Sequence, residues 1–187
     1  MQQKDIFPNN GEINIKKPNL LIHACCGICL ENFLNYFEKS FNITVYWFNP
    51  NINGIKEFRK RREVLRKILI NKNIKSEYNN FYNVKEFLNK ISDCNIRCHG
   101  CIEWRLDETV QFAKANGFDV FTTTLLTSPN QDYDYINKYG ELLSKKHNIE
   151  FLSYDMREDY NNNAVKEKGL YSQGYCGCIF SEEERYK

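Results

Sequence analysis

Cysteine is the residue type in this sequence whose spacing most clearly indicates chemistry. Seven of the eight cysteines among 187 residues fall into three tight groups that are far apart in the chain. The groups are Cys25-Cys26-Gly27-Ile28-Cys29, Cys98-His99-Gly100-Cys101 and Cys176-Gly177-Cys178. Thiolates from distant segments are typical of zinc sites and iron–sulfur clusters, although paired cysteines can also carry thiol–disulfide chemistry. Because one tetrahedral site takes four ligands, seven thiolates favour two adjacent centres, one with four ligands and one with three.

The spacing within each group indicates how the sulfur atoms are presented. Cys26 and Cys29 are three positions apart, so they would share one face of a first helical turn. Cys98 and Cys101 have the same spacing at the expected start of another helix. A helix N-terminus also lowers the pKa of a thiol, which favours the thiolate that a metal requires. In the third group, Gly177 lets the backbone turn so that both sulfurs face one metal.

Cys94 lies outside the three groups, and we expect it to be structural rather than a ligand. With Cys98 and Cys101 it forms C-x3-C-x2-C, a spacing that resembles radical S-adenosylmethionine enzymes. Gly100 stands where those enzymes often have an aromatic residue, and the chain is short for their usual barrel. The cysteine pattern is also compatible with a zinc-stapled nucleic-acid-binding module, or with a thiol–disulfide oxidoreductase that uses Cys98 and Cys101.

The composition is that of a soluble globular protein. Hydrophobic residues make up 42% and charged residues 27%, both ordinary values for such a chain. The polar start lacks the apolar core of a signal peptide, and no apolar run approaches the roughly 20 residues of a membrane span. We therefore expect a cytoplasmic protein with no membrane association. Thiols stay reduced in the cytoplasm, so clustered cysteines there favour metal binding or catalysis over disulfides.

A basic segment stands out although the net charge is only +2. Arg59-Lys60-Arg61-Arg62 followed by Arg66-Lys67 places six cations within nine residues. On a helix this segment could bind phosphates, and the alternative is a solvated helix face.

Strands alternate with helices along the chain, which predicts a three-layer α/β fold with a mostly parallel sheet, Rossmann-like or HUP-like. Strands are expected at residues 20–24, 43–48, 74–78, 120–126 and 149–153, and helices at 27–39, 56–72, 84–91, 101–116, 133–147 and from 161 onward, where the helix runs into a Gly-rich loop. Residues 1–17 are expected to form a polar leader and residues 18–187 a single α/β catalytic domain. Because ligands of such sheets bind beyond the carboxyl ends of the strands, a metal site is predicted there, where Cys25 and Cys26 follow the first strand.

Five stretches of the chain carry a resemblance to a known family. They are 21–29 (LIHACCGIC), 46–52 (YWFNPNI), 97–106 (RCHGCIEWRL), 121–129 (FTTTLLTSP) and 171–178 (YSQGYCGC). In this order they resemble the QueH-type epoxyqueuosine reductases over roughly residues 19 to 181. The resemblance implies reduction of the epoxide of epoxyqueuosine to queuosine in the tRNA anticodon loop, the last step of queuosine biosynthesis. It implies a [4Fe–4S] cluster without cobalamin, a second metal ion expected to be iron, and a tRNA substrate with a GUN anticodon. For the electrons we expect a donor such as reduced ferredoxin or flavodoxin.

The same resemblance implies roles for individual residues. The cluster ligands would be Cys25, Cys26, Cys98 and Cys101. The second, catalytic metal would be held by Cys29, Cys176 and Cys178. The family can have Asp at the position of Cys29, so a thiolate there changes the charge and softness of the site. Apart from the resemblance, proximity to the cysteine motifs makes Tyr175 the expected proton donor, with Tyr171 and His23 as alternatives. Substrate contacts are expected from Arg61, Arg97, Arg105, Thr123, Ser128 and Gln173.

Overall fold

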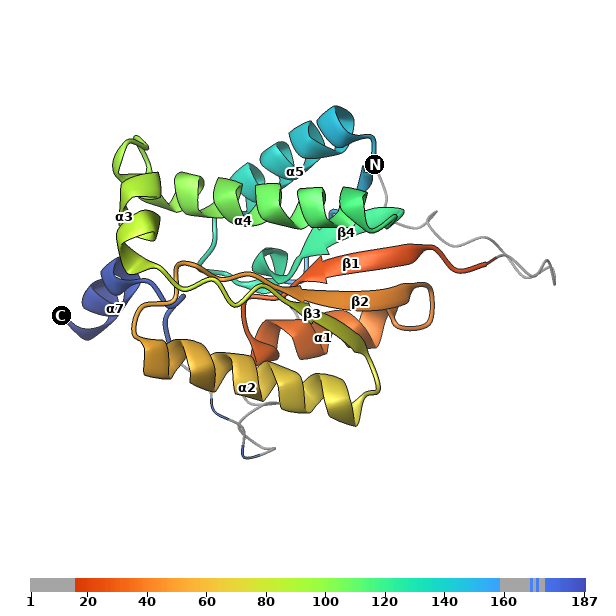
Figure 1. The fold of residues 1–187 in the computed structure, drawn as a ribbon, viewed down its shortest axis with the longest axis horizontal. Helices are drawn as coiled ribbons and strands as arrows, with labels where there is room; N and C mark the ends of the chain where they lie inside the picture. The colour runs from red at the N-terminus through yellow and green to blue at the C-terminus, as the bar shows by residue number, and fades with distance from the viewer. Residues whose placement is uncertain (1–15, 159–168, 170, 172–173) are drawn as a thin grey trace.

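The structure is a computed structural model that describes residues 16–158, 169, 171 and 174–187 (Figure 1). Nearly all of the expected polar leader lies outside these residues. Gln173 and the stretch 161–168, which was expected to be helical, also lie outside them.

A five-stranded parallel sheet in the order β3-β2-β1-β4-β5 forms the centre of the protein. The strands are β1 (Asn19–His23), β2 (Asn42–Trp47), β3 (Lys75–Tyr78), β4 (Val120–Thr123) and β5 (Glu150–Phe151). The chain begins in the middle with β1, continues outward to β2 and β3, and then crosses to β4 and β5. The winding direction therefore reverses between β1 and β4, and in open α/β sheets such a switch point is where ligands bind.

Helices cover both faces of the sheet, so the predicted three-layer fold is confirmed (Figure 1). One face carries α1 (Gly27–Phe37) and α2 (Ile55–Asn71), and the other carries α4 (Arg97–Ala115) and α5 (Tyr133–His147). Two short helices, α3 (Val84–Ser92) and α7 (Ile179–Tyr186), lie at the end of the molecule near the start of α4.

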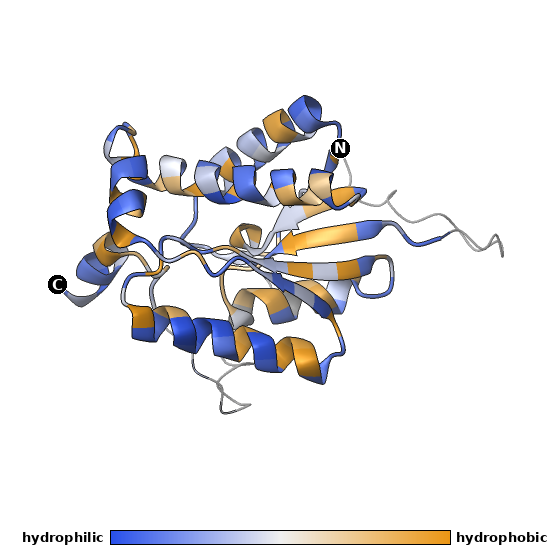
Figure 2. Ribbon diagram, in the orientation of Figure 1, coloured by the Kyte–Doolittle hydropathy of each residue, from blue (hydrophilic) through white to orange (hydrophobic). Residues whose placement is uncertain are grey.

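The sheet separates two apolar cores. In β1, Leu20 and Ile22 pack with α1 and α2, whereas Leu21 packs with α4 and α5. A strand that is buried on both faces needs apolar side chains in both directions, and β1 is accordingly mainly orange in Figure 2. This two-sided burial fixes β1 and, with it, the cysteines that follow it.

Element ends differ from the sequence predictions in two places near the site. The strand expected over 120–126 ends at Thr123, and Thr124–Thr127 forms a 3-10 turn, η1. Hydroxyl groups turn the chain here: Thr123 Oγ1 accepts from the Leu125 N–H (3.2 Å), and Thr127 Oγ1 donates to the Thr124 carbonyl (2.8 Å). In addition, α4 begins at Arg97 instead of residue 101, so Cys98 lies inside its first turn.

Candidate metal site at the carboxyl ends of the strands

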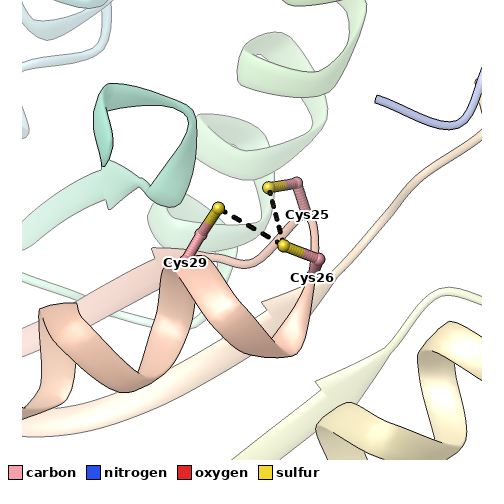
Figure 3. A group of neighbouring side chains, drawn as sticks. All are labelled: Cys25, Cys26 and Cys29. Carbon is pink, nitrogen blue, oxygen red and sulfur yellow. Dashed lines mark hydrogen bonds between the residues drawn. The ribbon is translucent and has the colours of Figure 1, made fainter. Parts of the chain in front are cut away.

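Cys25, Cys26 and Cys29 bring their sulfur atoms together where β1 ends (Figure 3). All three sulfurs lie within 4.8 Å of one another. The separation is 3.9 Å between Cys25 and Cys26 and 3.3 Å between Cys26 and Cys29. Cys26 is the N-cap of α1 and Cys29 lies in its first turn, so the three-residue spacing places both on one side of the helix. Three thiols at these separations can ligate one metal centre or be divided between two adjacent ones.

The three thiols hold their protons unequally. Hydrogen bonds from Cys26, Cys29 and Thr124 hold the pKa of the Cys25 thiol well below its usual range, despite burial. The same contact with Cys25 raises the pKa of Cys26 to about 12 and the pKa of Cys29 well above its ordinary value. Of the three thiols, Cys25 is therefore the one whose thiolate form the neighbours favour. Binding of metal by Cys26 and Cys29 would require these thiols to release their protons.

Thr124 contacts Cys25, and the sequence analysis did not predict this. From the same loop it selected Thr123 and Ser128 instead. The Thr124 hydroxyl donates to the Cys25 sulfur (3.3 Å) and accepts from the Cys25 backbone N–H (3.1 Å). The run of threonines directly after a strand at this edge was the signal that could have indicated it.

The third group, Cys176-Gly177-Cys178, forms a compact loop before α7. The sulfurs of Cys176 and Cys178 are 3.7 Å apart, and the Ser181 hydroxyl lies 3.0 Å from the first and 3.4 Å from the second. The Cys178 thiol lowers the pKa of Cys176 to about 5, and the same contact raises the pKa of Cys178. Gly177 between them has φ +115, in the region that favours glycine.

Arg105 of α4 connects all three cysteine groups electrostatically. Its side chain is only 2% exposed, and its Nε donates to the Cys101 carbonyl (3.2 Å). Burial opposes its charge, but Cys101, Cys176, Cys25 and Cys178 together raise the pKa of the guanidinium. A buried positive charge near thiols favours their thiolate forms. Metal ions and iron–sulfur clusters bind cysteine in that form.

The remaining pair is less tightly gathered. Cys98 is exposed and Cys101 is buried, and the group of sulfurs within 4.8 Å includes neither of them. Burial, with a contribution from Cys176, raises the pKa of both thiols, that of Cys101 to about 11. Cys178 and Phe180 pack against the apolar cluster that contains Cys101, so the first turn of α4 lies beside the Cys176 loop.

The loop after β2 joins the first and third cysteine groups. Asn49 Nδ2 donates to the Ala24 carbonyl (2.9 Å), beside the first group. Asn51 Nδ2 donates to the Cys176 carbonyl (3.4 Å), and the Asn53 N–H donates to the Gly177 carbonyl (2.8 Å). Sequence reasoning assigned no site role to these residues, although three asparagines directly after a strand at this edge were visible.

His23 of β1 connects its strand to β4 and to the residue directly after β2 through its ring nitrogens. Its Nε2 lies 3.0 Å from the Phe48 carbonyl, which can only accept, so Nε2 carries the hydrogen. Its Nδ1 then accepts from the Thr123 hydroxyl (2.8 Å). Burial, aided by Arg105, lowers the pKa of His23 to about 4, so the ring is neutral near pH 7. A neutral, fully buried ring does not suit the proton-donor role that was one alternative for His23.

The residues expected to contact substrate occupy different environments. Arg97 is 54% exposed, with its guanidinium over the Phe180 ring (4.2 Å), and Ser128 is half-buried. Thr123, Arg61 and Arg105 are buried, so of these five residues Arg97 and Ser128 are the more accessible to a large substrate. The substrate contacts stay predictions. Gln173 lies outside the described residues.

Cys94 is half-buried, and the group of sulfurs within 4.8 Å does not include it. Its thiol donates to the Lys90 carbonyl (3.7 Å). A Cβ at Gly100 would lie 2.3 Å from the Cys94 sulfur, so the glycine makes room for this side chain. The C-x3-C-x2-C spacing thus has a packing explanation.

The parallel sheet, and the three cysteine sulfurs gathered where β1 ends, define an α/β protein with a candidate metal–thiolate centre at its strand ends. The family model described as "Epoxyqueuosine reductase QueH" matches residues 20–184. The chain belongs to this family.

Relatives with the same description cover most of the chain. Epoxyqueuosine reductase QueH of Dehalococcoides mccartyi is 33% identical over 173 residues, which are 90% of this chain and 95% of that protein. The Thermotoga maritima protein of the same name is 30% identical over 178 residues, covering 89% of this chain and 91% of that protein.

A solved structure supports the fold. It is the U34-tRNA thiolase NcsA from Methanococcus maripaludis with its [4Fe-4S] cluster, with a TM-score of 0.58 and 17% sequence identity. The match covers 91% of this chain and 64% of that one, and at this identity it shows the fold alone. Within the part of the chain that the structure describes, none of the helices has the length and apolar character needed to cross a membrane.

Proposed function

We propose that this protein reduces the epoxide of epoxyqueuosine to queuosine in the anticodon loop of tRNA, with an iron–sulfur cluster and an adjacent metal ion. One observation supports this proposal beyond the family assignment: three cysteines gather their sulfurs within 4.8 Å of one another where β1 ends, beside the switch point of the sheet. Cysteines from three distant segments also act electrostatically on the buried Arg105. The NcsA neighbour, a tRNA-modifying enzyme with a [4Fe-4S] cluster, supports the proposal by analogy of fold.

The donor set fits the proposed metals. All seven proposed ligands are cysteines, and soft thiolates suit iron–sulfur clusters and iron. We assign the cluster to Cys25, Cys26, Cys98 and Cys101, and the second metal to Cys29, Cys176 and Cys178. When bound, the cluster would supply electrons one at a time, and the second metal would supply Lewis acidity.

The reaction needs more than metals. Conversion of an epoxide to an alkene consumes two electrons and two protons and releases one water. We propose a protein electron carrier such as ferredoxin or flavodoxin as the source of these electrons. We assign one proton to Tyr175, which precedes Cys176 and lies with its ring 5.0 Å from the Arg61 guanidinium carbon. Burial, with the nearby Glu57, raises the pKa of Tyr175, so it holds its proton until a strongly basic oxygen develops beside it.

The outer face of α2 is the proposed site for tRNA phosphates. This helix contains seven Lys and Arg and two Glu, so its net charge of +5 exceeds the +2 of the whole chain. Its exposed cations are Lys56, Arg59, Lys60, Arg66 and Lys67. Because α2 begins beside the Cys176 loop, phosphates bound along it would direct the anticodon loop toward the thiols.

Anaerobic purification followed by iron and sulfide analysis tests the cofactor assignment. The loaded protein is then incubated with dithionite and epoxyqueuosine-containing tRNA, and mass spectrometry of the nucleosides is expected to show loss of one oxygen atom. A zinc-stapled module would be colourless, because zinc is d10, and would leave the epoxide intact. Either result would overturn the proposal.

A further inference from the structure

Arg61 is a charged residue on the buried face of a helix. It lies one turn from Phe58 and one turn from Leu65 on the side of α2 that packs into the core, and its side chain is 2% exposed. Its Nη2 atom has no hydrogen-bond partner among the described residues. A buried guanidinium with an unpaired donor is costly, and an apolar side chain would pack on this face without that cost. The position therefore has a role other than stabilising the core.

The remaining atoms of the guanidinium connect two parts of the protein. Nε donates to Glu57 Oε1 (2.6 Å) on the preceding turn of α2. Nη1 donates to the Cys176 carbonyl (2.9 Å), far away in the sequence. The Tyr171 hydroxyl donates to Glu57 Oε2 (2.7 Å), so the carboxylate is held from both sides. Arg61 thus has a fixed orientation, with its Nη1 atom directed at the Cys176 loop.

The loop is shaped to accept this contact. A Cβ at Gly177 would lie 2.6 Å from Arg61 Nη1 and 3.2 Å from Ile52 Cγ1, so a side chain there would displace the arginine. The Cys176 carbonyl also accepts from Asn51 Nδ2 (3.4 Å), and the Gly177 carbonyl accepts from the Asn53 N–H (2.8 Å). Two successive carbonyls of the loop are therefore bound to α2 and to the loop after β2.

We propose that Arg61, oriented by Glu57 and Tyr171, is a positioning residue that docks the Cys176-Gly177-Cys178 loop against α2 so that both sulfurs face the second metal. The part of this proposal that concerns the second metal rests on the proposed function. The part that concerns docking of the loop rests on geometry alone. Lys cannot replace Arg61 in this role. Its single ammonium lacks the rigid fork of donors that lets Arg61 donate to Glu57 and to the Cys176 carbonyl at the same time.

Hydrogen exchange of the full, reduced, metal-free chain tests the docking. In Arg61→Met, the Asn53 amide, which donates to the Gly177 carbonyl, is expected to exchange roughly tenfold faster or more, because the loop opens locally. Arg61→Lys should resemble Arg61→Met. Arg59→Met, which removes an exposed cation from the same helix, should leave Asn53 protection unchanged.

Iron and sulfide analysis of the same variants after anaerobic loading tests whether Arg61 is needed for binding of the second metal. Arg61→Met is expected to keep cluster iron and sulfide and to lose the additional iron, whereas Arg59→Met keeps both. Wild-type exchange at Asn53 and full iron in Arg61→Met would overturn the proposal, as would full restoration by Arg61→Lys. If circular dichroism shows that Arg61→Met is unfolded, exchange of the Asn53 amide is measured in Tyr171→Phe instead. Exchange faster than in the wild type, by less than tenfold, supports the proposal, and an unchanged rate overturns it. Normal docking with no epoxide reduction in the wild-type protein would contradict the proposed function and not this inference.

Discussion

Thr124 binds Cys25 twice, through an acceptor contact to its backbone N–H (3.1 Å) and a donor contact to its sulfur (3.3 Å). One buried hydroxyl from the turn after β4 therefore fixes both the backbone and the thiolate of the first cysteine after β1. Because β1 and β4 flank the switch point of the sheet, this contact ties the sulfur group to the part of the fold where ligands bind.

Thr124→Val should raise the pKa of the Cys25 thiol, because the hydrogen bond that favours its thiolate is lost. Alkylation of the Cys25 peptide near neutral pH, followed by mass spectrometry on the metal-free chain, is expected to slow. The free energy of unfolding should also fall by about 1–3 kcal/mol, because the Cys25 N–H loses its acceptor.

Thr122→Val is the matched control for that substitution. Thr122 is equally buried, and its hydroxyl donates to the Leu152 carbonyl (2.7 Å) instead of a thiol. It should lower stability by a similar amount and leave Cys25 alkylation unchanged. Equal alkylation rates in the two variants would contradict a role for Thr124 in thiolate stabilisation.

A second prediction concerns the packing of Cys94 on Gly100. In Gly100→Ala the new methyl group would lie 2.3 Å from the Cys94 sulfur, so the variant should lose about 1–3 kcal/mol of stability from overpacking. Cys94→Ala removes that sulfur, and the double variant should recover most of the loss. Urea unfolding of all four proteins gives the coupling energy between the sites. Additive effects of the two substitutions would disprove the packing role, and loss of iron in Cys94→Ala would indicate a ligand instead.

The sequence was sufficient for the layers and for the edge of the sheet that carries the site. Apolar strands alternating with amphipathic helices permit few other arrangements, and cysteines directly after β1 must lie at its carboxyl end. The threonine run after residue 120 was misleading, because β-branched residues favour strands. In the fold, hydroxyl–backbone hydrogen bonds after Thr123 compete with the ladder and form a turn.

Contacts between distant segments were beyond sequence reasoning. The spacing of Cys26 and Cys29 predicted their shared face, but the docking of the Cys176 loop on Arg61 depends on tertiary structure. The helical period did contain a signal for Arg61, which lies in register with Phe58 and Leu65 on the buried face. The density of positive charge around it suggested phosphate binding instead.

A third prediction separates the two proposed metal centres. Cys98→Ala should lose the brown colour and most of the iron and sulfide, because one of four cluster ligands is missing. Cys178→Ala should keep the cluster absorption, lose the additional iron and abolish epoxide reduction. Metal analysis with visible spectroscopy distinguishes these outcomes. Unchanged iron in Cys98→Ala would contradict its ligand assignment, and full activity of Cys178→Ala would rule out a catalytic metal at that residue.

The charge of α2 gives a fourth prediction. Arg59→Glu together with Lys67→Glu reverses two exposed cations on the proposed phosphate-binding face while the buried Arg61 stays in place. Because each phosphate contact releases counterions, tRNA affinity at low salt should fall roughly tenfold or more, and the dependence of affinity on salt should become shallower. Lys145→Glu with Lys146→Glu makes the same charge change in the last turn of α5, which lies on the opposite face of the sheet. Binding measured over a salt series should separate the two variants: equal losses would mean that only net charge matters, and no loss in the α2 variant would place the tRNA on another surface.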